Sequence, residues 1–295
     1  MHQAAAWIAD LWLARHSANS ETRRAARSAV GHLTPAVVVT GGSQGIGLAL
    51  ATEFLSAGRA VVLVARDQGK LTVVAATLGS QSGNKVFTIA CDVTGAACYD
   101  IIAGKLSDFG CYLDVLVNSA GVGLAGPFLD HDPVEIERLI ALNVTAVTTL
   151  TRAALPDMVA RGRGGILNVA SLGAYVPGPH QAAYYASKAY VVSLSEAIAS
   201  EIAGLGVRVT ALAPGPVNTG FHAAMGAERS LYRTLLPALT PQQLAASGYR
   251  GFTLGRRIVV PGLFNRLMFT ALWILPHAIT VPIVRSLLKI PEQNS

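Results

Sequence analysis

Residues 183–190 read AYYASKAY and place three tyrosines next to one lysine. The pKa of a free tyrosine is about 10, too high for easy proton exchange at neutral pH unless a neighbour lowers it. A lysine cation is such a neighbour, because it favours the charged phenolate. Side chains three or four positions apart are neighbours on a helix, which admits Tyr184 and Tyr185 beside Lys188 and excludes Tyr190. Helix geometry alone does not choose between the first two tyrosines.

A glycine-rich loop, TGGSQGIG at residues 40–47, offers a second kind of chemistry. It follows an apolar, β-branched run that is typical of a buried parallel strand. Gly41, Gly45 and Gly47 allow the backbone to turn tightly and to approach a ligand closely. A helix that begins here directs free N–H groups and the positive end of its dipole at that ligand. The loop therefore predicts a diphosphate site, and tight strand–helix packing is the alternative explanation for its glycines.

The end of the second predicted strand, at residues 60–66, bears on which dinucleotide would bind. Folds that bind NAD commonly place an acidic residue near this point to hold the adenosine ribose hydroxyls. Here the strand ends with Ala65, which has no charge, and Arg66, which can bind a 2′-phosphate. Asp67 lies one residue past the strand end and is expected to face away. This pattern favours NADP(H) over NAD(H).

Alternating strand and helix patterns must position these residues. Short apolar runs predict strands at residues 36–40, 60–66, 86–93, 113–121, 164–171 and 207–215, and residues 256–262 are a candidate for a seventh. Asp132 before Pro133, and Thr240 before Pro241, predict two helix starts. Strands separated by helices require crossover connections. The predicted fold is α/β, with a single Rossmann-like, doubly wound parallel sheet of about seven strands and helices on both faces.

Seven short segments also follow one another in a particular order. They are TGGSQGIG (40–47), CDV (91–93), NSAG (118–121), LNV (142–144), VAS (169–171), YYASK (184–188) and PGPVNT (214–219). In this order they resemble the motifs of the short-chain dehydrogenase/reductase family, over residues 36 to about 220. Ser119 is a mild departure, because the family usually has asparagine at that position. The first 34 residues and the last 75 fall outside the common pattern.

The resemblance implies a catalytic tetrad of Asn143, Ser171, Tyr184 and Lys188. The family's tyrosine lies four residues before its lysine, so Tyr184 rather than Tyr185 is the implied acid. It would protonate the substrate oxygen as hydride passes from the nicotinamide to the carbonyl carbon. Lys188 would lower the pKa of Tyr184 and hold the nicotinamide ribose, Ser171 would hydrogen-bond the substrate oxygen, and Asn143 would hold a water that relays protons to Lys188. A strand cap at Ser171 and a helix kink at Asn143 are the structural alternatives.

The resemblance also implies which residues contact the dinucleotide. They are Gly41, Ser43, Gln44, Gly45, Ile46, Gly47, Arg66, Asp92, Val93, Asn118, Ala120, Gly121, Tyr184, Lys188, Pro214, Gly215, Val217 and Thr219. Members of the family pair their long helices across subunits, which predicts a homodimer or homotetramer. In this chain, Ile198 and Ile202 are the expected apolar surface for that contact.

Residues 173–180 and 218–240 are the segments expected to bind substrate. They are rich in apolar residues, which favours an apolar substrate, acyl or lipid-like. His180 and His222 could line this region, but no histidine pair has metal-ligand spacing, so no metal site is expected. The predicted function is NADP(H)-dependent interconversion of a ketone or aldehyde and an alcohol. The alternatives are a membrane-peripheral lipid or 3-oxoacyl reductase and a non-catalytic, cofactor-binding regulator.

The charge distribution separates the end of the chain from the rest. Eight basic residues and no acidic residue lie between Arg229 and Pro291, which leaves 15 of the 23 Lys and Arg and 16 of the 17 Asp and Glu in residues 1–228. We therefore predict an N-terminal arm at residues 1–34, a catalytic domain at residues 35–262 and an apolar, basic extension at residues 263–295. The extension predicts contact with an anionic membrane surface or an acidic carrier, and no nucleic acid is expected.

Within this extension, residues 267–284 carry no charged side chain over 18 positions, which is barely enough to span a bilayer. Pro276 and Pro282 are each expected to interrupt a helix. The leading expectation is that the segment is buried, over the substrate site or in a subunit interface. A helix lying in the membrane surface and a true span are the alternatives.

Composition bounds the class of protein. The 295 residues are 52% hydrophobic and 14% charged, which excludes a disordered chain. Three cysteines without paired or metal-ligand spacing favour free thiols in a reducing compartment. No basic region leads into a long apolar run, so no secretory signal is expected. A cytoplasmic enzyme is predicted, peripheral to the membrane if its C-terminal extension docks there.

Overall fold

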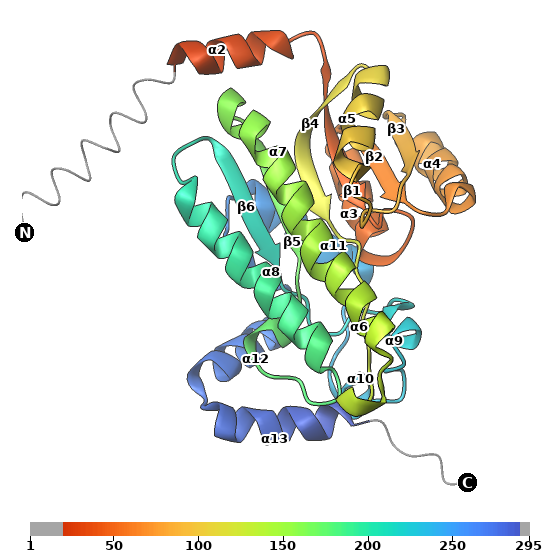
Figure 1. The fold of residues 1–295 in the computed structure, drawn as a ribbon, viewed down its shortest axis with the longest axis vertical. Helices are drawn as coiled ribbons and strands as arrows, with labels where there is room; N and C mark the ends of the chain where they lie inside the picture. The colour runs from red at the N-terminus through yellow and green to blue at the C-terminus, as the bar shows by residue number, and fades with distance from the viewer. Residues whose placement is uncertain (1–19, 290–295) are drawn as a thin grey trace, which may run out of the picture.

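Seven parallel strands form one sheet in the order β3-β2-β1-β4-β5-β6-β7. The computed structural model describes residues 20–289 (Figure 1). The strands are β1 (Thr34–Thr40), β2 (Ala60–Ala65), β3 (Val86–Ala90), β4 (Cys111–Asn118), β5 (Gly164–Val169), β6 (Val207–Leu212) and β7 (Ile258–Val259). The chain runs outward from β1 to β3 and then returns to β4 at the other side of β1, so the strand order reverses between β1 and β4. The predicted doubly wound sheet is confirmed, and residues 256–262 do contain its seventh strand.

Helices cover both faces of the sheet. One face packs against α3 (Gly45–Ser56), α4 (Gln68–Ser82) and α11 (Pro241–Thr253). The other packs against α5 (Cys98–Asp108), α7 (Val147–Arg161) and α8 (Ala182–Glu201). The shorter elements are α2 (Ser20–Ala29), η1 (Phe128–Asp130), α6 (Pro133–Ile140), η2 (Ala141–Ala146), η3 (Leu172–Tyr175), α9 (Phe221–Ala224), α10 (Leu231–Leu235), α12 (Leu263–Ile274) and α13 (His277–Leu288).

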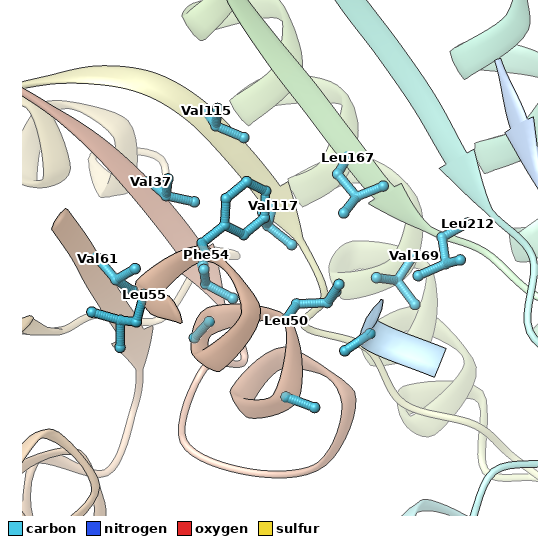
Figure 2. Close-up of a cluster of buried hydrophobic side chains, with 14 of the residues drawn as sticks. Val37, Leu50, Phe54, Leu55, Val61, Val115, Val117, Leu167, Val169 and Leu212 are labelled. Carbon is cyan, nitrogen blue, oxygen red and sulfur yellow. The ribbon is translucent and has the colours of Figure 1, made fainter. Parts of the chain in front are cut away.

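The alternation of side chains along β1 explains why the sheet needs both layers. Val37 and Val39 point into the layer that contains α3, whereas Ala36 and Val38 point into the layer that contains α5 and α7, and all four are fully buried. Figure 2 shows the first layer, where Phe54 and other apolar side chains of α3 lie against the strands. The core thus fixes the positions of the strand ends and of the loops that follow them.

Two of the helix starts follow the predicted capping signals. The Asp132 side chain accepts the N–H of Val134 at the start of α6, whose first residue is Pro133. Thr240 and Gln243 form a complete capping box at the start of α11. Both signals are local, so the sequence carries them without help from tertiary contacts.

The long helix α8 departs from one expectation. Ile198 and Ile202 are partly buried and pack against the cluster between α8 and the sheet, so only part of each side chain is left for the intersubunit contact assigned to them from sequence. The reason is that they lie on the same apolar stripe of the helix as the buried Val191. The homo-oligomer itself stays a prediction.

The predicted N-terminal arm is described from residue 20 onward, and the apolar residues near its start lie outside the described part. Its helix α2 docks on the C-terminal end of α7, where the Arg27 Nε donates to the carbonyl of Arg161 over 2.7 Å. A cation at this end of a helix is favourable because the dipole is negative there.

The apolar C-terminal segment folds as two short helices, α12 and α13, at the end of the molecule opposite α2 (Figure 1). Pro276 separates them, as predicted, but Pro282 lies inside α13 instead of interrupting it. One described helical run, Pro133–Arg161, is long and apolar enough to cross a membrane by length and composition. That run lies on the sheet and buries Leu150 and Met158 in the core.

Candidate active site

The reversal of strand order between β1 and β4 opens the carboxyl edge of the sheet to a ligand. The loops after β1, β4, β5 and β6 meet at this edge, and each carries one of the sequence motifs. The glycine loop follows β1, NSAG follows β4, Ser171 follows β5 and PGPVNT follows β6. The fold therefore gathers residues that lie far apart in the sequence.

The glycine loop has the geometry of an anion site. Gly41 and Gly45 have φ angles of +65° and +57°, in the left-handed region that favours glycine. A Cβ on Gly47 would lie 2.4 Å from the carbonyl oxygen of Gly41, so only glycine fits there. Helix α3 begins at Gly45, and Gln44 before it provides no side-chain cap. The first N–H groups of α3 therefore remain available to a phosphate.

The other motifs close around this loop. A Cβ on Gly41 would lie 2.9 Å from the Cα of Ala120, which places NSAG directly against the loop. The side chain of Thr219 is the nearest neighbour of Gly45 on its other side, at 3.6 Å from a Cβ there. The glycine loop, NSAG and PGPVNT, three motifs predicted to bind one dinucleotide, thus lie side by side.

Arg66 and Asp67 have different environments at the end of β2. The Asp67 side chain caps α4, since its Oδ1 accepts the N–H of Lys70 over 3.0 Å. Arg66 is exposed, and its charge lies near enough to Asp92 to contribute to a lowered pKa of that carboxyl group. The larger cause of this lowered pKa is Thr94, whose N–H and hydroxyl both donate to Asp92 Oδ1. Asp67 thus caps α4 with one carboxylate oxygen, and the side chains of both Asp67 and Arg66 are exposed.

Ser171, Tyr184 and Lys188 come together after β5 and on α8. Ser171 Oγ accepts the N–H of Gly173 over 3.1 Å, which leaves its hydroxyl hydrogen free to donate. Burial raises the pKa of the Tyr184 phenol, and the nearby Ser171 side chain opposes that rise. The Lys188 Nζ donates to the carbonyl of Val169 over 2.9 Å and lies 5.8 Å from the centroid of the Tyr184 ring. A proton donor, a second hydroxyl and an amine therefore share one site.

The pKa of Tyr184 shifts in the direction opposite to the one expected from its lysine. Burial raises the pKa of the Tyr184 phenol well above its ordinary value, and the Ser171 contact opposes that rise only in part. Burial also lowers the pKa of Lys188 to about 8, which weakens the cation that was expected to stabilise the phenolate. Tyr184 is thus held in its protonated form at neutral pH.

Tyr185 faces a different environment from Tyr184. Its ring packs against the backbone of residues 173–180, where a Cβ on Gly178 would lie 2.3 Å from the ring and a Cβ on Gly173 would lie 2.9 Å from it. The Tyr184 ring instead contacts Phe221, with ring centroids 5.6 Å apart. The two tyrosines, equivalent by helix spacing, are thus distinguished by their packing.

Asn143 lies in η2, a π-helical turn between α6 and α7. Such turns interrupt the regular hydrogen-bond ladder and are frequent at functional sites. The buried Asn143 side chain accepts the N–H of Val122 over 3.0 Å and donates to the carbonyl of Val122 and to Ser187 Oγ. Ser187 in turn donates to the carbonyl of Tyr184 over 2.7 Å. The side chain thus links the segment after β4 to the catalytic helix, and the water-holding role predicted for it is not tested by these contacts.

A family model described as short chain dehydrogenase matches residues 35–230, which is more than half of the chain.

The chain belongs to the short-chain dehydrogenase/reductase family.

Relatives and solved structures within this family are named as dehydrogenases and reductases. The very-long-chain 3-oxoacyl-CoA reductase of Bos taurus is 37% identical over 186 residues, which cover 62% of this chain and 59% of that protein. A short-chain dehydrogenase from Sphingobium yanoikuyae in complex with NADPH superimposes with a TM-score of 0.73 at 32% identity, covering 81% of this chain and 92% of that chain. A short-chain dehydrogenase/reductase from Burkholderia phymatum in complex with NAD gives a TM-score of 0.75 at 25% identity, over 90% and 99% of the two chains.

Sequence reasoning missed a set of buried polar residues that hold the short-chain dehydrogenase site together. Thr40 Oγ1 accepts the N–H groups of Ser119 and Ala120, each over 3.1 Å. Asn118, predicted to contact the cofactor, has a buried side chain whose Nδ2 donates to Thr151 and Asn168. Thr40 ends the buried strand β1 and is the first residue of the TGGSQGIG loop. A polar residue at the end of an apolar strand was the signal in the sequence that could have identified it.

A second polar group lies near Tyr184. The Tyr232 hydroxyl is 2.7 Å from His222 Nδ1, and burial lowers the pKa of His222 to about 4, so the imidazole is neutral. The rings of Tyr184, Phe221, His222 and Tyr232 form a chain of contacts, with successive centroids 5.6, 5.8 and 5.6 Å apart. His222 therefore lies near Tyr184, and His180 precedes α8 with a positive φ of 68°. Among residues 20–289 no three His, Cys, Asp or Glu side chains gather as a metal site.

Asn265 was not foreseen either. It lies in the first turn of α12, is buried, and fills the space beside Gly215, where a Cβ would be 2.3 Å from its Oδ1. Its Nδ2 donates to the carbonyl of Pro261 over 2.8 Å. This contact joins the C-terminal helices to the PGPVNT motif.

Proposed function

We propose that this short-chain dehydrogenase/reductase uses NADP(H) to interconvert a ketone or aldehyde with an alcohol on an apolar substrate, acyl or lipid-like. The observation that carries the proposal is the meeting of Ser171, Tyr184 and Lys188, with Lys188 beside Gly121 of the NSAG segment that packs against the uncapped glycine loop. The loop supplies phosphate-binding N–H groups and the three side chains supply proton chemistry, so the two parts of one reaction lie next to each other.

The side chains suit the reductive direction. The bound nicotinamide cofactor supplies the hydride that the carbonyl carbon receives. Ser171 donates a hydrogen bond to the carbonyl oxygen, where negative charge develops. Tyr184, kept protonated by burial, breaks its O–H bond and transfers the proton to that oxygen, which becomes the hydroxyl of the alcohol. Lys188, whose pKa is about 8, is suited to return a proton to the phenolate.

Selectivity for NADP(H) is proposed from the end of β2. Asp67, the acid that could have held ribose hydroxyls, caps α4 instead, while Arg66 is exposed and close to Asp92. A guanidinium can bind a 2′-phosphate through two hydrogen bonds. The NADPH complex of the Sphingobium yanoikuyae relative supports this choice, and the NAD complex of the Burkholderia phymatum relative marks the competing one.

An apolar substrate is proposed from the surroundings of Tyr184. Buried Val176, Met225 and Tyr232 pack around it together with Phe221. The Bos taurus relative, named as acting on very-long-chain 3-oxoacyl-CoA, supports an acyl or lipid-like substrate. A 3-oxoacyl thioester is therefore the first substrate to assay.

The Arg66→Ala variant tests both the cofactor and the reaction. We expect the KM for NADPH to rise by about ten- to a hundredfold, because a charge-assisted hydrogen bond to a phosphate contributes about 1.5–3 kcal/mol. The KM for NADH should change little, which makes NADH the internal control. Steady-state rates with a panel of apolar ketones measure both. Equal kcat/KM for NADPH and NADH in the unmodified protein would overturn the cofactor assignment, and no turnover with either cofactor on any carbonyl would overturn the reaction.

A further inference from the structure

The two C-terminal helices, α12 and α13, form a hairpin (residues 263–288) with an unusually apolar outer face. On α12, Leu263, Leu267 and Ile274 are 74%, 63% and 66% exposed and follow one another at helical spacings of four and seven. Trp273 next to them is 76% exposed. On α13 and the turn before it, Leu275, Ile279 and Ile283 are between 40% and 53% exposed. Several large apolar side chains exposed on two successive helices are what an interaction site requires.

The inner face of the same hairpin packs against the active site. Val284 and Leu288 are buried in a cluster that also contains Tyr184, Tyr185 and Tyr232. Further along, Phe269 of α12 contacts the Tyr175 ring, with centroids 4.7 Å apart. The expectation that this segment is buried over the substrate region therefore holds for one face of each helix and is wrong for the other.

The charges around the outer face all have one sign. Arg266, Arg285 and Lys289, on or at the end of the two helices, are exposed, and so are Arg256 and Arg257 directly before β7. Between Arg229 and Lys289 the chain has no acidic residue. The salt bridges among residues 20–289 join Arg59, Lys70, Lys105 and Arg163 to aspartates elsewhere, so none of these basic residues has a carboxylate partner within the described chain.

This pattern argues against a second copy of the chain as the partner. A twofold interface brings the same patch of two subunits together. The arginines of one hairpin would then face those of the other with no carboxylate between them, which costs free energy where the charges lose water. An acidic protein would satisfy the charges but not the exposed leucine, isoleucine and tryptophan side chains.

We propose that the hairpin docks on an anionic lipid surface, with its outer apolar side chains in the headgroup and acyl boundary and its arginines and Lys289 at the phosphates. Helices with one apolar face, basic flanks and an interfacial tryptophan bind membranes in this way. Each helix has only 12 residues, which is too short to span a bilayer but sufficient to lie in its surface. The proposal does not depend on which cofactor the enzyme uses.

The two faces of the hairpin together define how the docked enzyme would work. A helix with its side chains is about 10–12 Å thick. Because the inner face of the hairpin contacts the aromatic cluster around Tyr184, docking would place the substrate region within about one helix thickness of the lipid. A substrate dissolved in the bilayer would then enter without crossing bulk water.

The test is co-sedimentation of the full-length protein with vesicles at low salt. We expect binding to vesicles of phosphatidylglycerol and phosphatidylcholine, weaker binding at high salt, and little binding to phosphatidylcholine alone. The Arg285→Gln/Lys289→Gln variant should bind about 25-fold more weakly, since each basic residue contributes about a factor of five near an anionic surface. The Leu267→Ser/Trp273→Ser variant should lose at least about tenfold, because two large apolar side chains no longer leave water.

Matched controls use exposed positions away from the hairpin. Val73→Ser/Ile101→Ser removes apolar side chains that are 67% and 45% exposed on α4 and α5, and Arg24→Gln/Arg152→Gln removes two exposed charges on α2 and α7. Both should bind vesicles like the unmodified protein. The proposal fails if the unmodified protein stays in the supernatant, or if the hairpin variants bind as tightly as the controls. It also fails if the Leu267→Ser/Trp273→Ser variant changes the oligomer mass without lipid, because a second copy would then be the partner.

Discussion

Tyr184 works in surroundings that make its proton hard to lose. Burial raises the pKa of the phenol, and burial lowers the pKa of the nearby Lys188 to about 8, which leaves its ammonium group mostly charged at pH 7. A donor that stays protonated is suited to deliver a proton to a forming alkoxide, whereas oxidation of an alcohol needs the phenolate. The protonated phenol therefore fits the reductive step proposed above, and an oxidised cofactor with its positive charge would lower the pKa of Tyr184 for the reverse reaction.

The two neighbouring tyrosines allow a matched comparison. Tyr184→Phe removes the proposed acid and should lower turnover by about 100- to 10,000-fold, the range for general acid catalysis. Tyr185→Phe removes a hydroxyl whose ring is held by the backbone at Gly173 and Gly178, and it should keep most of its activity. Steady-state rates, with cofactor affinity measured separately and expected to be unchanged in both variants, decide the matter. If Tyr185→Phe is the inactive variant, the assignment of the acid is wrong.

Lys188 predicts a dependence of stability on pH. Its pKa is about 8 in the folded protein against 10.5 as an ordinary value, so between these pH values the unfolded chain binds more protons than the folded one. Stability must then rise with pH in this window. Relative to Lys188→Met, which does not titrate, the free energy of unfolding of the unmodified protein should increase by about 3 kcal/mol from pH 8 to pH 10.5. Denaturant unfolding of both proteins at several pH values measures this, and parallel curves would refute the lowered pKa.

At the scale of elements, the geometry of the site depends on side chains that hold one segment of the chain against another. The loop at residues 173–180 rests on the ring of Tyr185, and the π turn at Asn143 connects the segment after β4 to α8. Helix caps such as Asp132 and Thr240 could be predicted because each uses only neighbours in sequence. The Asn143 contacts could not, because Val122 and Ser187 become its neighbours only in the folded chain.

Two glycine substitutions test how tightly the loop at residues 173–180 packs against the ring of Tyr185. Gly178→Ala places a methyl group 2.3 Å from the Tyr185 ring, so the loop or the ring must move, and stability should fall by about 1–3 kcal/mol, with turnover reduced. Gly104→Ala lies in α5 with no atom within 4 Å of the new methyl group, and stability should rise by about 0.5–1 kcal/mol. Chemical denaturation of the two variants should therefore give changes of opposite sign. An unchanged Gly178→Ala protein would mean that the loop adapts and does not constrain Tyr185.

For the whole molecule, the sequence predicted the sheet well because its strands are buried, apolar and separated by helices of regular length. The predicted sheet also implied that the motif residues meet at one edge, because parallel strands end on the same side of a sheet. The outer face of the C-terminal hairpin could not be foreseen in this way. An apolar residue such as Leu267 has the same sequence signature whether it faces the core or solvent, and only the packing of Val284 and Leu288 on the aromatic cluster determines which face is left over.

The contact between Asn265 and Gly215 carries a consequence for biosynthesis. A ribosome releases the chain from its N-terminal end, and folding begins before the later residues emerge. The strands β1 to β6 and the residues Ser171, Tyr184 and Lys188 all precede Asn265 in the chain. A nascent chain thus holds Ser171, Tyr184 and Lys188 while the aromatic cluster still lacks α12 and α13 and the space beside Gly215 is still unfilled. Asn265 fills that space first, and Val284 and Leu288 reach the cluster only when α13 has followed, so a chain halted before Asn265 would possess these three side chains without their enclosure.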